Sequence, residues 1–133
     1  MTARFAMWAA NAFDAVEPGN MDGAETATGF NLTAAESDQY AEWVANEVHS
    51  LDVSIAQKNF EDPSSVLAPY FDFAVEGQCF QYDDCSDLAP YTAVGKAVFE
   101  VEYQGQDESP TSFCPSANAA GYNLVEFDLN LDA

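Results

Sequence analysis

The chain has 133 residues, of which 48% are hydrophobic, and its 23 acidic residues against three basic ones give a formal net charge of −20. This length fits one domain or part of one, and the hydrophobic content is sufficient for a packed core. No apolar run reaches the ~18 residues of a membrane span, and so acidic a composition argues against binding nucleic-acid phosphates.

Helices and strands are predicted to alternate along the whole chain. The capping box of Thr33 and Glu36 opens the longest helix, whose last turn holds His49, where a partial positive charge suits the helix dipole. One apolar stripe of this helix is predicted from Tyr40, Trp43, Val44 and Val48. The predicted elements are a helix over 1–11, a strand over 12–17, a helix over 33–50, a strand over 52–56, a short helix over 63–68, a strand over 71–75, a short helix over 86–93, a strand over 96–101, a short helix over 115–119 and a strand over 123–129.

This order of elements predicts an α/β fold built from parallel β-α units with right-handed crossovers. Five strands are too few for a closed eight-stranded barrel, which typically needs ~250 residues. The sequence therefore predicts either a small open sheet or part of a barrel.

Polar side chains gather where the predicted strands end. In parallel α/β folds the carboxyl ends of the strands carry the functional sites. The residues at these ends are Glu17, Asn20 and Asp22, then Gln57, Lys58 and Asn59, then Glu76 and Gln78, then Glu102 and Tyr103, and finally Asp128, Asn130 and Asp132. This set of side chains suits a carbohydrate. Amides and carboxylates bind hydroxyl groups, aromatic rings stack on sugar faces, and two carboxylates perform glycosidic chemistry.

Lys58 and Lys96 lie at opposite ends of their predicted strands, so we interpret their roles differently. Lys58 stands at a strand end between Gln and Asn, where it either contacts a ligand or neutralises nearby carboxylates as a structural partner. Lys96 begins its strand at the opposite rim, so we interpret it as structural.

No metal or other cofactor is predicted. The chain has one His and no CxxC pair, and its acidic residues do not follow the spacing of an EF-hand. Cys79 and Cys85 flank a short loop and either form a disulfide or remain reduced and buried, and Cys114 is the odd thiol.

The net charge has three interpretations. A composition so poor in lysine is typical of proteins from high salt, where the Debye length falls to ~3 Å at 1 M and charge repulsion is screened. An ordinary acidic secreted protein and the attraction of a cationic partner are the alternatives.

Five motifs, in order and with similar spacing, resemble glycoside hydrolase family 114, the endo-α-1,4-polygalactosaminidase-like proteins. They cover residues 13–23, 29–30, 57–59, 71–80 and 95–103. The resemblance implies a (β/α)8 TIM barrel, of which residues 1–133 are the C-terminal part, beginning before the fourth strand. It also implies an extracellular glycosidase that acts on α-1,4-linked galactosamine, a cationic amino-sugar polysaccharide, with the N-terminal half of the barrel as a further partner.

The chain departs from the family pattern at two glycines. Gly19 and Gly77 stand where the resemblance places the catalytic carboxylates. The remaining acid–base candidates are Glu17, Asp22, Glu76 and Glu102, and the candidates for substrate binding are Asn20, Lys58, Asn59, Gln78 and Tyr103. Three hypotheses follow: an active hydrolase, a non-catalytic sugar-binding relative, and an inactive fragment.

Overall fold

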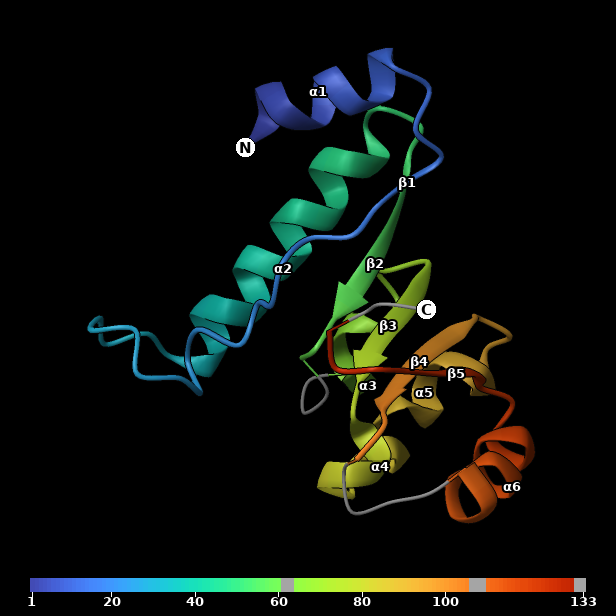
Figure 1. Ribbon diagram of the computed structural model, residues 1–133. Helices are drawn as coiled ribbons and strands as arrows, with labels where there is room; N and C mark the ends of the chain where they lie inside the picture. Colours follow the sequence, from blue (N-terminus) through green and yellow to red (C-terminus); the bar gives the residue numbers. More distant parts are fainter. Residues whose placement is uncertain (61–63, 106–109, 131–133) are drawn as a thin grey trace.

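The computed structural model describes residues 1–60, 64–105 and 110–130 (Figure 1). Five parallel strands form one sheet in the order β1-β2-β3-β4-β5. Their bounds are Ala15–Val16 for β1, Ser54–Lys58 for β2, Phe73–Gly77 for β3, Val98–Tyr103 for β4 and Asn123–Phe127 for β5. This arrangement confirms the predicted α/β class.

The order of the strands in space follows the order in the sequence, without a reversal. Right-handed crossovers that always advance in the same direction place their helices on one face of the sheet. A doubly wound sheet would instead reverse its strand order and carry helices on both faces. The sheet therefore corresponds to part of a TIM-type barrel, as the resemblance implies.

Helical segments connect the strands. They are α1 (Thr2–Ala10), α2 (Ala34–His49), α3 (Ser64–Leu67), α4 (Cys79–Tyr82), the 3₁₀ segment η1 (Cys85–Leu88), α5 (Ala89–Ala93) and α6 (Pro110–Ala120). The sequence did not predict α4, and α6 begins five residues before its predicted start, with Pro110 at its first position. Pro63, the predicted start of the helix now seen as α3, lies outside the described residues.

The first four strands begin two or three residues later than predicted, with β3 starting at Phe73 and β4 at Val98. Ala12 and Asp52 have φ angles of 58° and 55°, in the left-handed region, which is incompatible with a strand. Pairing therefore starts at Ala15 in β1 and at Ser54 in β2. β5 likewise ends at Phe127, two residues before the predicted end.

Helix α2 begins as predicted. The Thr33 side chain accepts a hydrogen bond from the Glu36 N–H, and Glu36 Oε2 accepts the Thr33 N–H at 2.9 Å. The predicted apolar stripe is only partly right, because Tyr40 and Trp43 are each 41% exposed. The buried stripe has the helical spacing i, i+3, i+4, i+7 and consists of Ala41, Val44, Ala45 and Val48.

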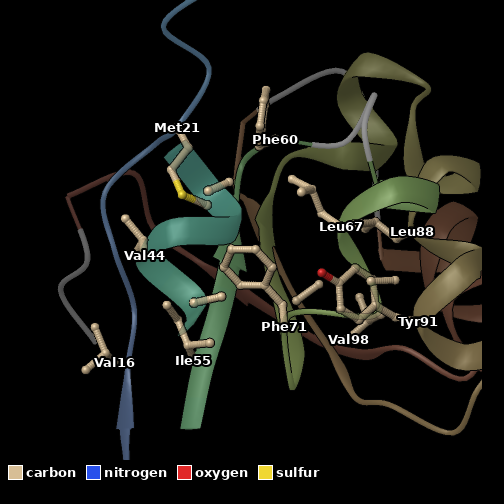
Figure 2. Close-up of a cluster of buried hydrophobic side chains, with 14 of the residues drawn as sticks. Val16, Met21, Val44, Ile55, Phe60, Leu67, Phe71, Leu88, Tyr91 and Val98 are labelled. Atoms are coloured by element: carbon tan, nitrogen blue, oxygen red, sulfur yellow. The ribbon is translucent and has the colours of Figure 1, made fainter. Parts of the chain in front are cut away.

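The core lies between the sheet and the helices that cover it (Figure 2). The ring of Phe71 lies between Ile55 on one side and Tyr91 on the other in this view. The Tyr91 hydroxyl donates a 2.6 Å hydrogen bond to Gln57 Oε1, and Gln57 Nε2 donates to Ser64 Oγ at 2.8 Å. Gln57, which stands at a predicted site edge, is thus a satisfied buried residue of the core.

Charged groups at the amino ends of the strands have structural roles. Lys96 Nζ donates to the Ala68 and Phe71 carbonyls at 2.6 Å each, which confirms its structural interpretation. Asp72 Oδ2 lies 2.9 Å from His49 Nε2 and accepts the Ile55 N–H at 2.9 Å. Burial raises the pKa of Asp72, but the His49 hydrogen bond and the Ile55 N–H outweigh it and leave that pKa below its ordinary value.

The other face of the sheet carries exposed apolar side chains. Phe99, Val125 and Phe127 are between 44% and 48% exposed. Phe73 and Phe99 meet edge to face, with ring centroids 5.8 Å apart. Among the described helices, none is long and apolar enough to cross a membrane.

Substitution of Tyr91 tests the buried hydrogen bonds of the core. In Tyr91→Phe the Gln57 Oε1 atom loses its donor inside the core, which costs about 1–3 kcal/mol of the free energy of unfolding. The Tyr82→Phe control, at a side chain that is 65% exposed, should leave that free energy unchanged within about 0.5 kcal/mol. Urea denaturation measures both, and equal values for the two variants would contradict the structural role of the Tyr91 hydroxyl.

Candidate functional site

A polar cleft of about 300 Å³ lies at the carboxyl ends of β2 and β3. Three segments that are far apart in the sequence build it: the loop after β1, the residue after β2, and the end of β3 with α4 behind it. The residues that line the cleft are Asn20, Asp22, Glu25, Asn59, Glu76, Gly77, Gln78, Tyr82 and Asp84. Five of the nine predicted site residues are therefore in one place, namely Asn20, Asp22, Asn59, Glu76 and Gln78.

Two residues of the cleft have unusual backbones. Asn59 has a φ of 41° and Gln78 a φ of 73°, both in the left-handed region. Asn adopts this conformation readily, but a residue with a long side chain pays about 1–2 kcal/mol. The Gln78 N–H offsets part of this strain by donating to the Val101 carbonyl at 2.8 Å. Strain of this kind concentrates at functional sites.

An unsatisfied acceptor lies inside the cleft. Asn59 Oδ1 is buried and accepts no hydrogen bond from any described residue. A Cβ atom added at Gly77 would lie 3.9 Å from Asn59 Nδ2 and 4.0 Å from Asn59 Oδ1, so there is unfilled space beside the amide. Buried polar atoms in native proteins are usually paired, and Asn59 Oδ1 departs from this pattern within the described part of the chain.

The cleft is strongly acidic. Four of its lining residues, Asp22, Glu25, Glu76 and Asp84, carry carboxyl groups, and none of its described lining residues is basic. Glu76 is only 3% exposed, and its Oε1 accepts the N–H of Gly77 at 2.9 Å. The local field therefore favours a ligand that carries positive charge and hydrogen-bond donors.

Other predicted site residues lie nearby but outside this cleft. Glu17 and Gly19 line a neighbouring pocket of about 250 Å³ between α1, the end of β1 and α2, and Asn20 lines both cavities. Lys58 is half-buried at the end of β2, and it forms no ion pair with a described residue. The neutralising role considered for Lys58 is thus not seen within the described part of the chain.

Glu102 and Tyr103 lie on opposite faces of β4, because side chains alternate along a strand. Glu102 is 1% exposed, and its Oε1 accepts the Phe80 N–H at 2.8 Å. Neither residue lines the polar cleft. Carboxylate oxygens of Glu102 and Glu100 lie within 4.8 Å of Cys79 Sγ, but Cys79 forms a disulfide, so no thiolate is available there for a metal ion.

The disulfide joins Cys79 to Cys85 with an S–S length of 1.95 Å, which settles the pairing that the sequence left open. Cys114 is a free, half-buried thiol. The disulfide links the start of α4 to the start of η1, behind the cleft residues Tyr82 and Asp84.

The sequence did not single out three lining residues: Glu25, Tyr82 and Asp84. Asp83 and Asp84 are next to each other in the sequence and resemble ordinary solvated loop charges. Only Asp84 is half-buried at the cleft, whereas Asp83 is exposed with a φ of 62°. Two cysteines that flank a short loop indicate that the loop between Cys79 and Cys85 is constrained. They do not indicate which side chains of that loop point into a cleft.

Comparison with known proteins gives two matches. A family model described as glycoside-hydrolase family GH114 matches residues 1–133. The chain is also similar to the crystal structure of Aspergillus fumigatus Ega3 in complex with galactosamine, at 30% sequence identity and a TM-score of 0.85. That match covers 99% of this chain and 57% of the other. No curated protein matches the chain.

The left-handed backbone of Gln78 is tested by a glycine substitution. Gln78→Gly removes the penalty on φ, so we expect the free energy of unfolding to rise by about 0.5–1 kcal/mol. Gln104→Gly is the control, because Gln104 lies in an exposed turn without a positive φ, and there the added chain entropy should lower the free energy. Denaturant titration that shows a loss at both positions would contradict the strain at Gln78.

Proposed function

Because the chain belongs to glycoside hydrolase family GH114, we propose that it acts on a polysaccharide of α-1,4-linked galactosamine that binds in the polar cleft. One observation carries the proposal: the buried Asn59 Oδ1 accepts no hydrogen bond from a described residue and lies beside unfilled space at Gly77, in a cleft lined by carboxyl groups. The solved relative, Ega3, was crystallised with galactosamine, which supports an amino sugar as the ligand class.

The chemistry of galactosamine suits this cleft. Its hydroxyl groups and its ammonium group are donors, and the cleft offers acceptors from Asn20, Asn59 and Gln78 together with carboxylates. A cation among carboxylates forms charge-assisted hydrogen bonds, which are roughly twice as strong as neutral ones. An acetylated or neutral sugar would lose that part of the binding.

Hydrolysis requires two carboxyl groups at the scissile bond, one to donate a proton and one to act as base or nucleophile. Of the four acid–base candidates from the sequence, Asp22 and Glu76 line the cleft. We assign them the two roles in the proposed reaction. Glu17 and Lys58 would extend the binding surface along the rim.

A second candidate function is binding without cleavage. It is favoured by Gly19 and Gly77, which supply no acid, base or nucleophile at the positions where the family resemblance expects carboxylates. Both positions have room for a side chain, since a Cβ at Gly19 meets nothing within 4 Å and one at Gly77 has ordinary contacts.

An extracellular location is part of the proposal. The Cys79–Cys85 disulfide supports it, because disulfides form and persist in oxidising compartments. The exposed apolar face of the sheet, with Phe99, Val125 and Phe127, supports the further proposal that the remaining strands of the barrel cover this face as a partner.

Binding is tested through Asn59. We expect Asn59→Ala to weaken the binding of a de-N-acetylated α-1,4-galactosamine oligosaccharide by roughly tenfold, because a hydrogen bond to a charged group is lost. Alanine is disfavoured at the left-handed φ of residue 59, so Asn59→Gly, which adopts this φ freely, is the second variant and should bind equally weakly. The exposed Asn118→Ala is the matched control. Calorimetry that finds equal affinities for both variants and the wild type would contradict a site at Asn59.

Catalysis is tested by the release of reducing ends from the same oligosaccharide. Under the hydrolytic proposal the wild type releases them, and Asp22→Asn and Glu76→Gln each lose at least about a hundredfold of the rate. Binding without release would instead favour the second candidate. In that case the double variant Gly19→Asp, Gly77→Glu should gain hydrolysis, because both positions have space for the added carboxyl groups.

A further inference from the structure

The turn that leads out of β3 gives three consecutive backbone N–H groups to β4. The Gln78 N–H donates to the Val101 carbonyl at 2.8 Å, the Cys79 N–H to Glu100 Oε1 at 3.1 Å, and the Phe80 N–H to Glu102 Oε1 at 2.8 Å. The first turn of a helix cannot satisfy its own N–H groups. The glutamates of the neighbouring strand satisfy them for α4.

We propose that Glu100 and Glu102 share one proton and act as a positioning pair, which holds Gly77 and Gln78 in the geometry that the sugar cleft requires. The two residues lie behind the cleft and do not touch the ligand. This inference rests on the proposed function as far as the sugar is concerned, but the shared proton can be tested without any sugar.

Burial without a counter-ion carries the argument. Glu100 is 0% and Glu102 1% exposed. The only basic residues of the chain are Arg4, Lys58 and Lys96, and none of them forms an ion pair with a described residue. Two adjacent buried carboxylates without a cation would be very costly, so one of the two must be neutral.

The hydrogen-bond geometry identifies the neutral group. Glu100 Oε2 is fully buried and accepts no hydrogen bond from a described residue. A proton on Glu100 that is donated to the Glu102 carboxylate removes this unsatisfied atom. Burial and then the Glu102 hydrogen bond raise the pKa of Glu100 to about 9, which agrees with the assignment.

The other titratable groups around the pair reinforce it. Glu76 on β3 is in register with Glu100, and Glu126 on β5 is in register with Glu102. Burial raises the pKa of the Tyr122 phenol, so this neighbour is neutral, and Asp87 on η1 is an acidic group close to Tyr122. Cys79 does not titrate because it is in the disulfide. None of these neighbours is cationic, so none of them offsets the charge of an ionised Glu100, whereas the hydrogen bond from the Cys79 N–H favours the ionised form.

The pair connects the protonation of the fold to the cleft. Gly77 and Gln78 line the cleft, and the next two residues are the ones that Glu100 and Glu102 hold. Ionisation of both carboxyl groups would place two negative charges side by side, and their repulsion would separate the two side chains that hold Cys79 and Phe80. Because the native pKa of Glu100 is raised, the free energy of unfolding falls as pH rises from near 4.5 to about 9.

Carboxyl-carbon NMR tests the shared proton directly. We expect one carboxyl group of the pair to titrate near pH 9 and the amide shifts of Cys79 and Phe80 to move with it. In Glu102→Gln the Glu100 transition should move to lower pH, and in Glu126→Gln, which removes an acidic group from the neighbouring strand, it should stay close to pH 9. If both carboxyl groups titrate below pH 6, or if added Ca²⁺ displaces the transition, the proposal is overturned.

Calorimetry at pH 6.5 tests the link to the cleft with the de-N-acetylated galactosamine oligosaccharide. Glu100→Ala leaves the Cys79 N–H without its acceptor and should bind roughly tenfold more weakly. Glu100→Gln keeps an acceptor for this N–H and a donor for Glu102, so it should restore the affinity to within about twofold of the wild type. Glu126→Ala should bind like the wild type.

The outcomes separate the two proposals. Wild-type affinity in Glu100→Ala would overturn the positioning role, as would a Glu100→Gln variant that binds as weakly as Glu100→Ala. If the wild type itself does not bind the oligosaccharide, the proposed function fails, and the NMR titration of the apo protein still decides whether the two glutamates share a proton.

Discussion

The pairing of β3 with β4 is the constraint on which the rest of the site depends. Gly77, the last residue of β3, pairs with Val101, and β4 continues for two more residues to Tyr103. The N–H groups of residues 78–80 follow the end of β3, and they donate to the Val101 carbonyl and to the side chains of Glu100 and Glu102. This single register sets the turn at Gln78, the start of α4 and one side of the cleft, and the disulfide then joins the start of α4 to the start of η1.

The charge of −20 acts differently in different parts of the molecule. At the surface it repels itself and is screened by salt. Inside, the absence of a cation near Glu100 and Glu102 leaves a proton as the available neutralising charge. In the cleft, the same excess of carboxylates suits the proposed cationic sugar. Lys58, at the end of β2, forms no ion pair with a described residue. High salt would weaken the attraction of the sugar while stabilising the fold.

Family membership and the geometry of the cleft support the proposed amino-sugar ligand more strongly than they support its hydrolysis. The cleft contains amides, carboxylates and an acceptor without a partner among the described residues, which are the groups that the proposed sugar would contact. The two glycines remove carboxyl groups at positions where the structure has room for them. Asp22 and Glu76 are therefore the groups on which hydrolysis by this chain would depend, while Glu102 lies behind the cleft.

The sequence alone was sufficient for the alternation of helices and strands, for the capping box at Thr33 and Glu36, and for the strand ends that carry polar groups. These features depend on hydrogen bonds and periodicity between residues close in the chain. Only the tertiary structure decided that Glu102 faces the helices, that Asn59 Oδ1 accepts no hydrogen bond from the described residues, and that Glu25 and Asp84 complete the cleft. Those outcomes depend on the register between strands and on the burial of side chains from distant segments, and no local pattern determines either.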